Sequence, residues 1–414
     1  MMFNRILKGV IASFYGQGVT ILFQFLSVPL FITCWGIDGY GQWLTIFAIP
    51  MTLTMLDFGF FNILGNKISN ALQAQNKTNA CDIINITFLS LILIGIILIV
   101  IVVFVCEYIG TSYNLTLWLA LITYSILLLV ANFFVNIFRA NREYHIGSFL
   151  TNTARLIENA CVLLYLFTSP SMLNVSILYL VSRLVTSIFI FIFFKEKNRW
   201  YELKIRSFKC INITDIKDSF SYALMPIAFM LNNQGIIFLL NSIVGSAQVA
   251  IFVTARTYFR VINNVVTALT NSTWQEINYT ANEGNKAKLA SIMNKLNKFT
   301  VGASILCGCI LMAIFEFILQ IWTHGEITIS FHNSVMIMLS VVFFSLWQPY
   351  HIFLSAVGDY RIHTKAYFIL QVLLISFSYL LGVGFELFLM TSIFVEVVML
   401  MISHIIYVRR FSLI

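Results

Sequence analysis

The sequence predicts an all-α integral membrane protein with about twelve transmembrane helices, in two repeated lobes of six helices around a central cavity. Three observations lead to this fold class. Hydrophobic residues make up 59% of the chain and charged residues only 10%, unlike a soluble domain. Apolar runs of about 20 residues, each long enough to cross a hydrocarbon core, recur from end to end. One segment also has a counterpart about half a chain length later.

Windows of about 19 residues place the expected helices in order. Their ranges are 9–34, 39–64, 83–106, 115–138, 149–168, 173–194, 219–243, 248–271, 299–322, 331–356, 366–384 and 387–408. The last two are the least distinct, because only a tight turn around Glu386 separates them. The chain then divides into an N-lobe of residues 1–198, a basic cytoplasmic linker of residues 199–218 and a C-lobe of residues 219–414.

Lysine and arginine set the orientation of these helices, because positively charged loops are retained on the cytoplasmic side. Both termini and all even-numbered connections carry basic residues, whereas the odd-numbered connections carry none. All but four of the 25 basic residues therefore fall on one face, and both termini are expected in the cytoplasm. The formal charge of +8 reflects this topology and does not indicate a nucleic-acid partner.

The segment "WGIDGYGQW" at residues 35–43 has a counterpart, "VGSAQVAIF", 209 residues later. This offset aligns Gly36 with Gly245 and, without a gap, "QNK" at 75–77 with "GNK" at 284–286. One constant register over about 40 residues indicates a duplication, with the halves related by an axis along the membrane normal. Glycine suits the outer turn because a short connection between two spans needs backbone freedom.

The motifs of several enzyme classes are absent. Neither G-x-x-x-x-G-K-[ST] nor H-E-x-x-H nor a clustered metal-ligand pattern occurs, so neither a cofactor nor a metal ion is expected. The seven cysteines are scattered and suggest no disulfide framework. The longest loop, Lys195–Asp218, holds no catalytic domain, and the outer loops are short. These features indicate a transporter and not an enzyme.

Charges inside the predicted helices are informative, because each costs roughly a few to more than ten kcal/mol in lipid. Arg183, Arg256 and Arg260 lie deep in their helices and indicate a cavity that an anion visits. Arg256 and Arg260 are four residues apart and share one helix face. The other intramembrane charges are Asp57, Arg155, Glu158, Glu396 and, nearer the outer face, Glu316.

Several of these charges allow two interpretations. Arg155 and Glu158, three residues apart, either neutralise each other or belong to the cavity and its ion coupling. Asp57 either pairs with a basic neighbour near the cytoplasmic side or takes part in ion coupling. Glu396 stands alone in the last predicted helix. It either binds the coupling proton or forms a contact within the helix bundle.

Pro29 and Pro226 interrupt the first helix of each half. Proline removes a backbone hydrogen bond and allows a kink. Each kink is either static or a hinge on which the lobes rock during transport. Pro50 and Pro349 carry weaker versions of the same argument.

Four features together resemble the Wzx-type O-antigen flippases, of the polysaccharide-export branch of the multidrug/oligosaccharidyl-lipid/polysaccharide (MOP) exporter superfamily. These features are the basic N-terminus, "WGIDGYGQWLTI", "LDFGFFNILGNKISNA" and "VGSAQVAIFVTARTYFRVI". The resemblance implies a multi-pass protein of the bacterial inner membrane that serves lipopolysaccharide biosynthesis. Such a protein moves undecaprenyl-pyrophosphate-linked oligosaccharide to the periplasmic leaflet by alternating access, as an antiporter driven by an ion gradient.

The resemblance also implies partners and site residues. The partners would be the lipid-linked oligosaccharide, membrane lipid and other membrane proteins of polysaccharide assembly. Arg183, Arg256 and Arg260, with Arg155 as a further candidate, would contact the pyrophosphate, since arginine suits bidentate contact with phosphate oxygens. Glu158, Glu396 and Asp57 are the candidates for ion coupling.

Two other classes of protein compete with this interpretation. One is another transporter, either a drug exporter of the same superfamily or a major-facilitator sugar permease. The predominantly basic deep charge disfavours export of cationic drugs, and "GNKISNALQAQNKTNACD" lacks the basic motif expected after the second helix of such a permease. The other is a membrane polymerase or ligase acting on lipid-linked sugars. Such enzymes carry a long periplasmic loop, which is not found here.

Overall fold

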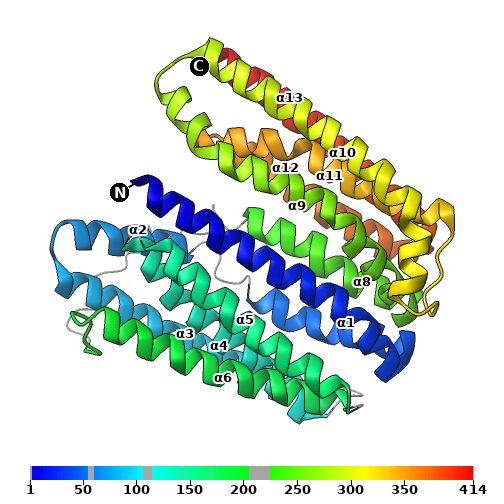
Figure 1. Ribbon diagram of the computed structural model, residues 1–414, viewed down its shortest axis with the longest axis horizontal. Coiled ribbons are helices and arrows are strands. Elements are labelled where there is room, and N and C mark those ends of the chain that lie inside the picture. The colour runs from blue at the N-terminus through cyan, green and yellow to red at the C-terminus, as the bar shows by residue number, and fades with distance from the viewer. Residues whose placement is uncertain are drawn as a thin grey trace. The chain divides into compact units, whose positions relative to one another are not determined.

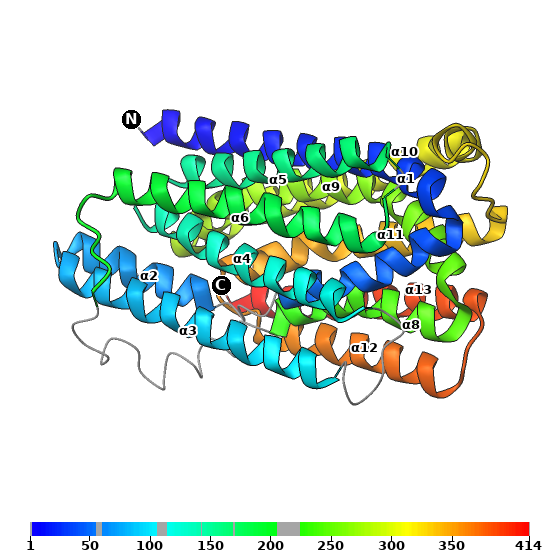
Figure 2. The same ribbon diagram turned by 90° about the horizontal axis from the view of Figure 1, so that it is seen from below.

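The computed structural model describes residues 2–54, 60–105, 114–141, 143–168, 170–204 and 224–413. These residues form helices joined by short turns (Figure 1, Figure 2). The α-helices are α1 Met2–Leu53, α2 Phe60–Gln73, α3 Lys77–Val105, α4 Leu115–Ala140, α5 Tyr144–Leu166, α6 Met172–Lys197, α8 Ile236–Val244, α9 Ser246–Asn282, α10 Lys286–Trp322, α11 Phe331–Ala356, α12 Arg361–Leu380 and α13 Phe385–Leu413. Helical residues 224–230 lead into a π-helical turn, η2, at Leu231–Gly235.

The predicted all-α membrane fold is confirmed. Eight helical stretches within the described residues are long and apolar enough to cross a membrane. The twelve predicted segments fall on helices apart from a few end residues and the parts, such as 55–59 and 219–223, that lie outside the described ranges. Helices α5, α9 and α12 are not among the eight, and the charged residues within α5 and α9 lower the hydropathy of these two.

A single glycine breaks the first long helix. At Gly36 the backbone has φ 70° and ψ 177°, and α1 resumes its helical course directly afterwards. This conformation is essentially restricted to glycine. The expected turn between the first two spans is therefore reduced to one residue. In the second half, Gly245 has φ 89° and ψ 171° and separates α8 from α9 in the same way.

The repeat extends to the turn at the other end of these helices. Gln75 has φ 57° and its counterpart Gly284 has φ 69°, so both occupy the left-handed region. The Asn76 side chain accepts a hydrogen bond from the Asn79 amide at 3.0 Å, matching the 3.0 Å bond from the Lys288 amide to Asn285. Two turns with equal geometry at one constant offset support the duplication that the sequence indicates.

The chain forms two compact units. The first comprises Met1–Trp35 and Ile46–Pro226, and the second comprises Gly36–Thr45 and Ile227–Ile414. The units divide between Pro226 and Ile227, beyond the expected linker of residues 199–218, most of which falls outside the described residues. The lobe limits 1–198 and 219–414 stay a prediction.

Each unit has its own apolar core. In the first unit, phenylalanines of α4 and α6 pack together, with Phe134 and Phe194 at a ring distance of 5.0 Å. In the second unit, α11 lies against both α9 and α13. The indole of Trp347 on α11 is completely buried there. This packing brings polar side chains of α9, α11 and α13 towards one another.

Candidate anion-binding site

A polar cavity of ≈ 340 Å³ lies in the second unit. Residues of η2, α9, α11 and α13 line it, together with Phe229 just before η2. The charged lining residues are Arg256, Arg260 and Glu396. The other polar lining residues are Asn232, Asn233, Asn263, Thr267, Ser340, Gln348 and His351. Two guanidinium groups thus face a single carboxylate, so the lining carries net positive charge when all three are ionised.

The two arginines of α9 donate to adjacent asparagines of the π-helical turn. Arg256 Nη1 donates to the carbonyl oxygen of Asn232 at 2.9 Å, and its Nη2 donates to Oδ1 of the same residue. Arg260 Nη2 donates to Oδ1 of Asn233. A π-helical turn changes the register of side chains around the helix. In η2 both neighbouring asparagines reach arginines that lie one turn apart on α9.

Glu396 on α13 is buried, with 1% of its surface exposed, and is surrounded by hydrogen-bond donors. Trp347 Nε1 donates to Oε2 at 2.8 Å. Asn232 Nδ2 donates to Oε1 at 3.2 Å, and Tyr367 and Gln371 approach the same oxygen at 3.4 and 3.5 Å. Such a shell stabilises a carboxylate, and none of the described residues forms a salt bridge with Glu396.

In the first unit, Arg183 forms a buried ion pair with Glu158. Nη2 of Arg183 lies 2.6 Å from Oε2 of Glu158, and the two side chains are 3% and 2% exposed. The Thr186 hydroxyl donates to the other oxygen of Glu158 at 3.1 Å. The Arg183 guanidinium also lies 5.6 Å from the centre of the Tyr124 ring. The charge of Arg183 is thus already compensated, unlike that of the two arginines on α9.

Arg155 does not share this buried environment. Its side chain is exposed on α5, and Nη1 donates to the Thr20 hydroxyl at 3.1 Å. Glu158 points to α6, so it is paired with Arg183 instead of with Arg155 three residues earlier on the same helix. Spacing along one helix allowed an Arg155–Glu158 pair as one of two interpretations, but contact with the neighbouring helix determines the partner of Glu158.

The remaining predicted residues lie at different places. Asp57 lies outside the described residues. Glu316 is exposed on α10. Pro29 lies within α1, and its carbonyl oxygen accepts a 2.8 Å hydrogen bond from Thr33. Pro226 lies in the helical residues that precede η2. The break in α1 is at Gly36 and not at Pro29.

Several site residues were missed by the sequence interpretation, which weighed charges and overlooked amides. The missed residues are Asn232, Asn233, Trp347, Gln348, His351, Tyr367 and Gln371. The sequence did contain a signal for Asn232 and Asn233. The run "NNQG" at 232–235 is a polar interruption in an otherwise apolar predicted helix. Uncharged amides lower hydropathy less than charges do, and so such an interruption is easily overlooked.

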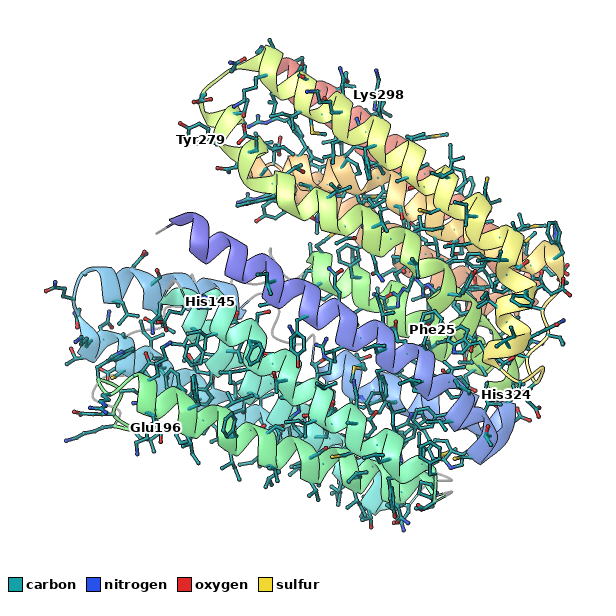
Figure 3. The ribbon with its side chains drawn as sticks, in the orientation of Figure 1. Phe25, His145, Glu196, Tyr279, Lys298 and His324 are labelled. Atoms are coloured by element: carbon teal, nitrogen blue, oxygen red, sulfur yellow. The ribbon has the colours of Figure 1, made fainter. Side chains whose placement is uncertain are left out.

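The first unit contains a hollow of opposite character. An apolar groove of ≈ 910 Å³ lies between α1, α5 and α6, with Tyr15, Phe149 and Phe189 among its lining residues. The two flanking helices α5 and α6 run antiparallel, since His145 and Glu196 lie at the same end of this unit (Figure 3). Among the described residues, the lining of this groove includes no arginine, which distinguishes it from the cavity of the second unit.

Comparison with models of protein families shows which family the chain belongs to. A family model described as "Polysaccharide biosynthesis protein" matches residues 6–274. The chain belongs to this family. A comparison with curated proteins finds no match.

Solved structures show the same fold. An inward-facing multidrug-resistance MATE transporter of the MOP superfamily has a TM-score of 0.71 and 14% identity, with 95% of this chain and 94% of that chain covered. An outward-facing MATE transporter has a TM-score of 0.66 and 15% identity, with 99% and 95% covered. A MOP superfamily transporter from Pyrococcus furiosus has a TM-score of 0.64 and 14% identity, also with 99% and 95% covered. The chain therefore has the fold of MATE transporters.

Proposed function

We propose that this protein is a secondary transporter that moves a lipid-linked oligosaccharide, carried on undecaprenyl pyrophosphate, across the bacterial inner membrane by alternating access. The direction would be from the cytoplasmic to the periplasmic leaflet, as in O-antigen assembly for lipopolysaccharide. The observation that carries the proposal is the pair Arg256 and Arg260 in a polar cavity within the membrane. Membership of the polysaccharide biosynthesis family supports a sugar-containing substrate.

The chemistry of the cavity fits a sugar pyrophosphate. Two guanidinium groups four residues apart on α9 offer several donors to adjacent phosphate oxygens. The hydrogen bonds that they make to Asn232 and Asn233 are to neutral oxygens, which a phosphate can replace with stronger, charge-assisted bonds. The amides and hydroxyls of Asn263, Thr267 and Gln348 can bond sugar hydroxyls.

The membrane potential assists the proposed transport. Moving one negative charge outward across a membrane with an inside-negative potential releases about 2.3 kcal/mol per 100 mV. A polyanionic headgroup therefore gains free energy from the membrane potential when it moves outward. Glu396, which lies in the same cavity, is the favoured ion-coupling group in this proposal. Glu158 and Asp57 are further candidates.

The proposal assigns unequal roles to the arginines. Arg256 and Arg260 make the main contacts to the pyrophosphate. Arg183 and Arg155 are the weaker candidates for such contacts, since Arg183 is already paired with Glu158 and Arg155 is exposed on α5. Other polysaccharide-assembly proteins of the membrane would supply the substrate and receive it after transport.

A drug exporter of the same superfamily is the second candidate function. The polarity of the cavity distinguishes drug export from transport of a lipid-linked oligosaccharide. For the transporter from Pyrococcus furiosus, a binding pocket of reverse polarity suggests a different function. In the present cavity a cationic drug would meet two arginines and one carboxylate. Like charges repel in a low-dielectric site, so this lining favours an anion.

A complementation experiment tests the proposal. Deleting the gene should abolish surface polysaccharide while the lipid-linked precursor accumulates, and the parental gene should restore export. Arg256→Ala and Arg260→Ala should each reduce export about 10- to 100-fold at normal protein level, as expected for a lost hydrogen bond to a charged group. Lysine should retain part of the export, because it keeps the charge but loses the planar donor geometry.

The control is Arg361→Ala. Arg361 is an exposed residue at the start of α12 and is predicted to be cytoplasmic. This variant should export at the parental rate. Parental export by both alanine variants on α9 would refute the proposed role of the cavity. Deletion without any effect on polysaccharide, together with increased drug sensitivity, would favour the second candidate.

A further inference from the structure

One buried amide joins the cationic part of the cavity to its carboxylate. Asn232 is 4% exposed and contacts both charges. Its Oδ1 and its carbonyl oxygen accept from Arg256, and its Nδ2 donates to Oε1 of Glu396 at 3.2 Å. The amide is thus held in one orientation by a donor on one side and an acceptor on the other.

The local backbone makes this double contact possible. Asn232 lies in the π-helical turn η2, which places it between α9 and α13. π-helical turns are uncommon and are frequent at functional sites. The adjacent Asn233 accepts a hydrogen bond from Arg260. Among the described residues, this is the side-chain hydrogen bond that Asn233 makes in the cavity, and none links it to Glu396. Asn232 is therefore the direct link between Arg256 and Glu396.

We propose that Asn232 couples the two ends of the cavity, so that binding of a polyanion at Arg256 and protonation of Glu396 favour one another. This inference rests on the proposed function, because it takes the pyrophosphate site as given and assigns a linked proton to it. Protonation here means transfer of one proton from water to a carboxylate oxygen, with no other bond made or broken.

The first part of the argument is competition for Arg256. A phosphate oxygen that accepts from Nη2 of Arg256 displaces the weaker neutral acceptor, Oδ1 of Asn232. The amide of Asn232 then loses the contact that fixes its orientation. The donor that Asn232 presents to Glu396 is weakened as a consequence.

The second part of the argument is charge. A bound polyanion neutralises Arg256 and places negative charge next to the cavity carboxylate, both of which disfavour ionised Glu396. Loss of a hydrogen bond to the charged form acts in the same direction. All three effects favour the protonated acid. By linkage, protonation of Glu396 must strengthen anion binding to the same extent.

Other titratable groups surround Glu396 and must be separated from it. Arg256 and Arg260 face the cavity from α9, His351 from α11 and Glu396 itself from α13. On α12, Tyr367 approaches Glu396 directly, and His363 stacks on His351 with ring centres 5.2 Å apart. Since the histidines could also take up a proton, the experiment compares variants at Glu396 with a variant at His351.

The test uses purified full-length protein and inorganic pyrophosphate as the probe. Calorimetric titrations in buffers of different ionisation enthalpy count the protons taken up per pyrophosphate bound. Pyrophosphate changes its own protonation on binding, so Glu396→Gln, which keeps both arginines, provides the baseline for this contribution. The parent should take up more protons than Glu396→Gln, which cannot titrate. The ratio of their Kd values should change with pH by up to about tenfold per pH unit, the limit for one linked proton.

Comparing Asn232→Ala with Asn233→Ala distinguishes the proposed coupling of Arg256 to Glu396 from pyrophosphate binding itself. Both variants should bind pyrophosphate, but only Asn232→Ala should lose most of the proton uptake that depends on Glu396. Asn232→Ser provides a second variant in case alanine impairs folding, and His351→Gln should keep the uptake. Equal uptake by both asparagine variants would overturn the role of Asn232.

The remaining outcomes distinguish this inference from the proposed function. Pyrophosphate binding that requires Arg256 but gives equal proton uptake in the parent and Glu396→Gln would overturn the coupling and leave the anion site intact. Net proton release through Glu396 would also overturn it. Failure of the parent to bind any more pyrophosphate than Arg256→Ala would overturn both the anion site and the coupling.

Discussion

Arg183 and Glu158 form an ion pair between α6 and α5 that is shielded from solvent, with 2.6 Å between Nη2 and Oε2. Removing one member of a buried pair leaves an uncompensated charge, whereas replacing both with neutral groups is often harmless. The pair therefore acts within the first unit as a specific interhelical contact. This role differs from that of Arg256 and Arg260, which donate to neutral asparagine oxygens.

The first prediction is that single variants of this pair destabilise the protein and the double variant does not. Glu158→Gln should lower the free energy of unfolding by about 3–5 kcal/mol, because it leaves a permanently charged arginine. Arg183→Met should cost less, because the remaining Glu158 can take up a proton and become neutral. The double variant should recover most of the loss. Thermal unfolding midpoints of the purified proteins measure these differences.

The exposed pair Lys197–Glu143 is the matched control. Its side chains are 31% and 34% exposed, and its N–O distance is 3.1 Å. Lys197→Met should change the free energy of unfolding by less than about 1 kcal/mol. Equal losses for the exposed and buried variants would contradict the assignment of Arg183 to a structural pair.

The second prediction concerns the glycines that break the helices. Gly36→Ala and Gly245→Ala should each cost about 1–3 kcal/mol, because alanine cannot adopt their positive φ with extended ψ without strain. Gly18→Ala is the control. Gly18 lies within α1, where an added Cβ meets no atom within 4 Å, so alanine should be neutral or stabilising there. Destabilisation by Gly18→Ala alone would contradict this interpretation.

Much of the fold was predictable from sequence, because apolar length and repeated glycines are local properties. The helices, and the offset that relates Gly36 to Gly245, required no knowledge of tertiary contacts. Partners across helices were not predictable in this way. Glu158 is paired with a residue of α6, and Glu396 is bonded by residues of η2, α11 and α12. Such choices depend on helix rotation, which hydropathy does not determine.

The third prediction is that Pro226 is a hinge. Pro226 lies five residues before the π-helical turn that holds Asn232, so bending there would move this turn. Pro226→Ala should leave membrane insertion intact, since alanine forms helices well, and should slow export of polysaccharide by straightening the helix. Pro29→Ala tests the proline in the first helix of the first half. Parental export by Pro226→Ala would make its kink a static feature.

The last prediction is the sidedness of the two equivalent turns after Asn76 and Asn285. A duplication of six helices leaves both copies in the same orientation, whereas an odd number would invert one of them. The turns share their backbone geometry and side-chain cap, and the positive charge of their surroundings predicts that both lie in the cytoplasm. Reporter fusions after these two residues should therefore be active only as cytoplasmic reporters. Fusions after Asn114 and Gly325 should be active only as periplasmic ones. A cytoplasmic turn at Asn76 with a periplasmic turn at Asn285 would mean an inverted repeat, and the twelve-helix arrangement of two parallel halves would then be wrong.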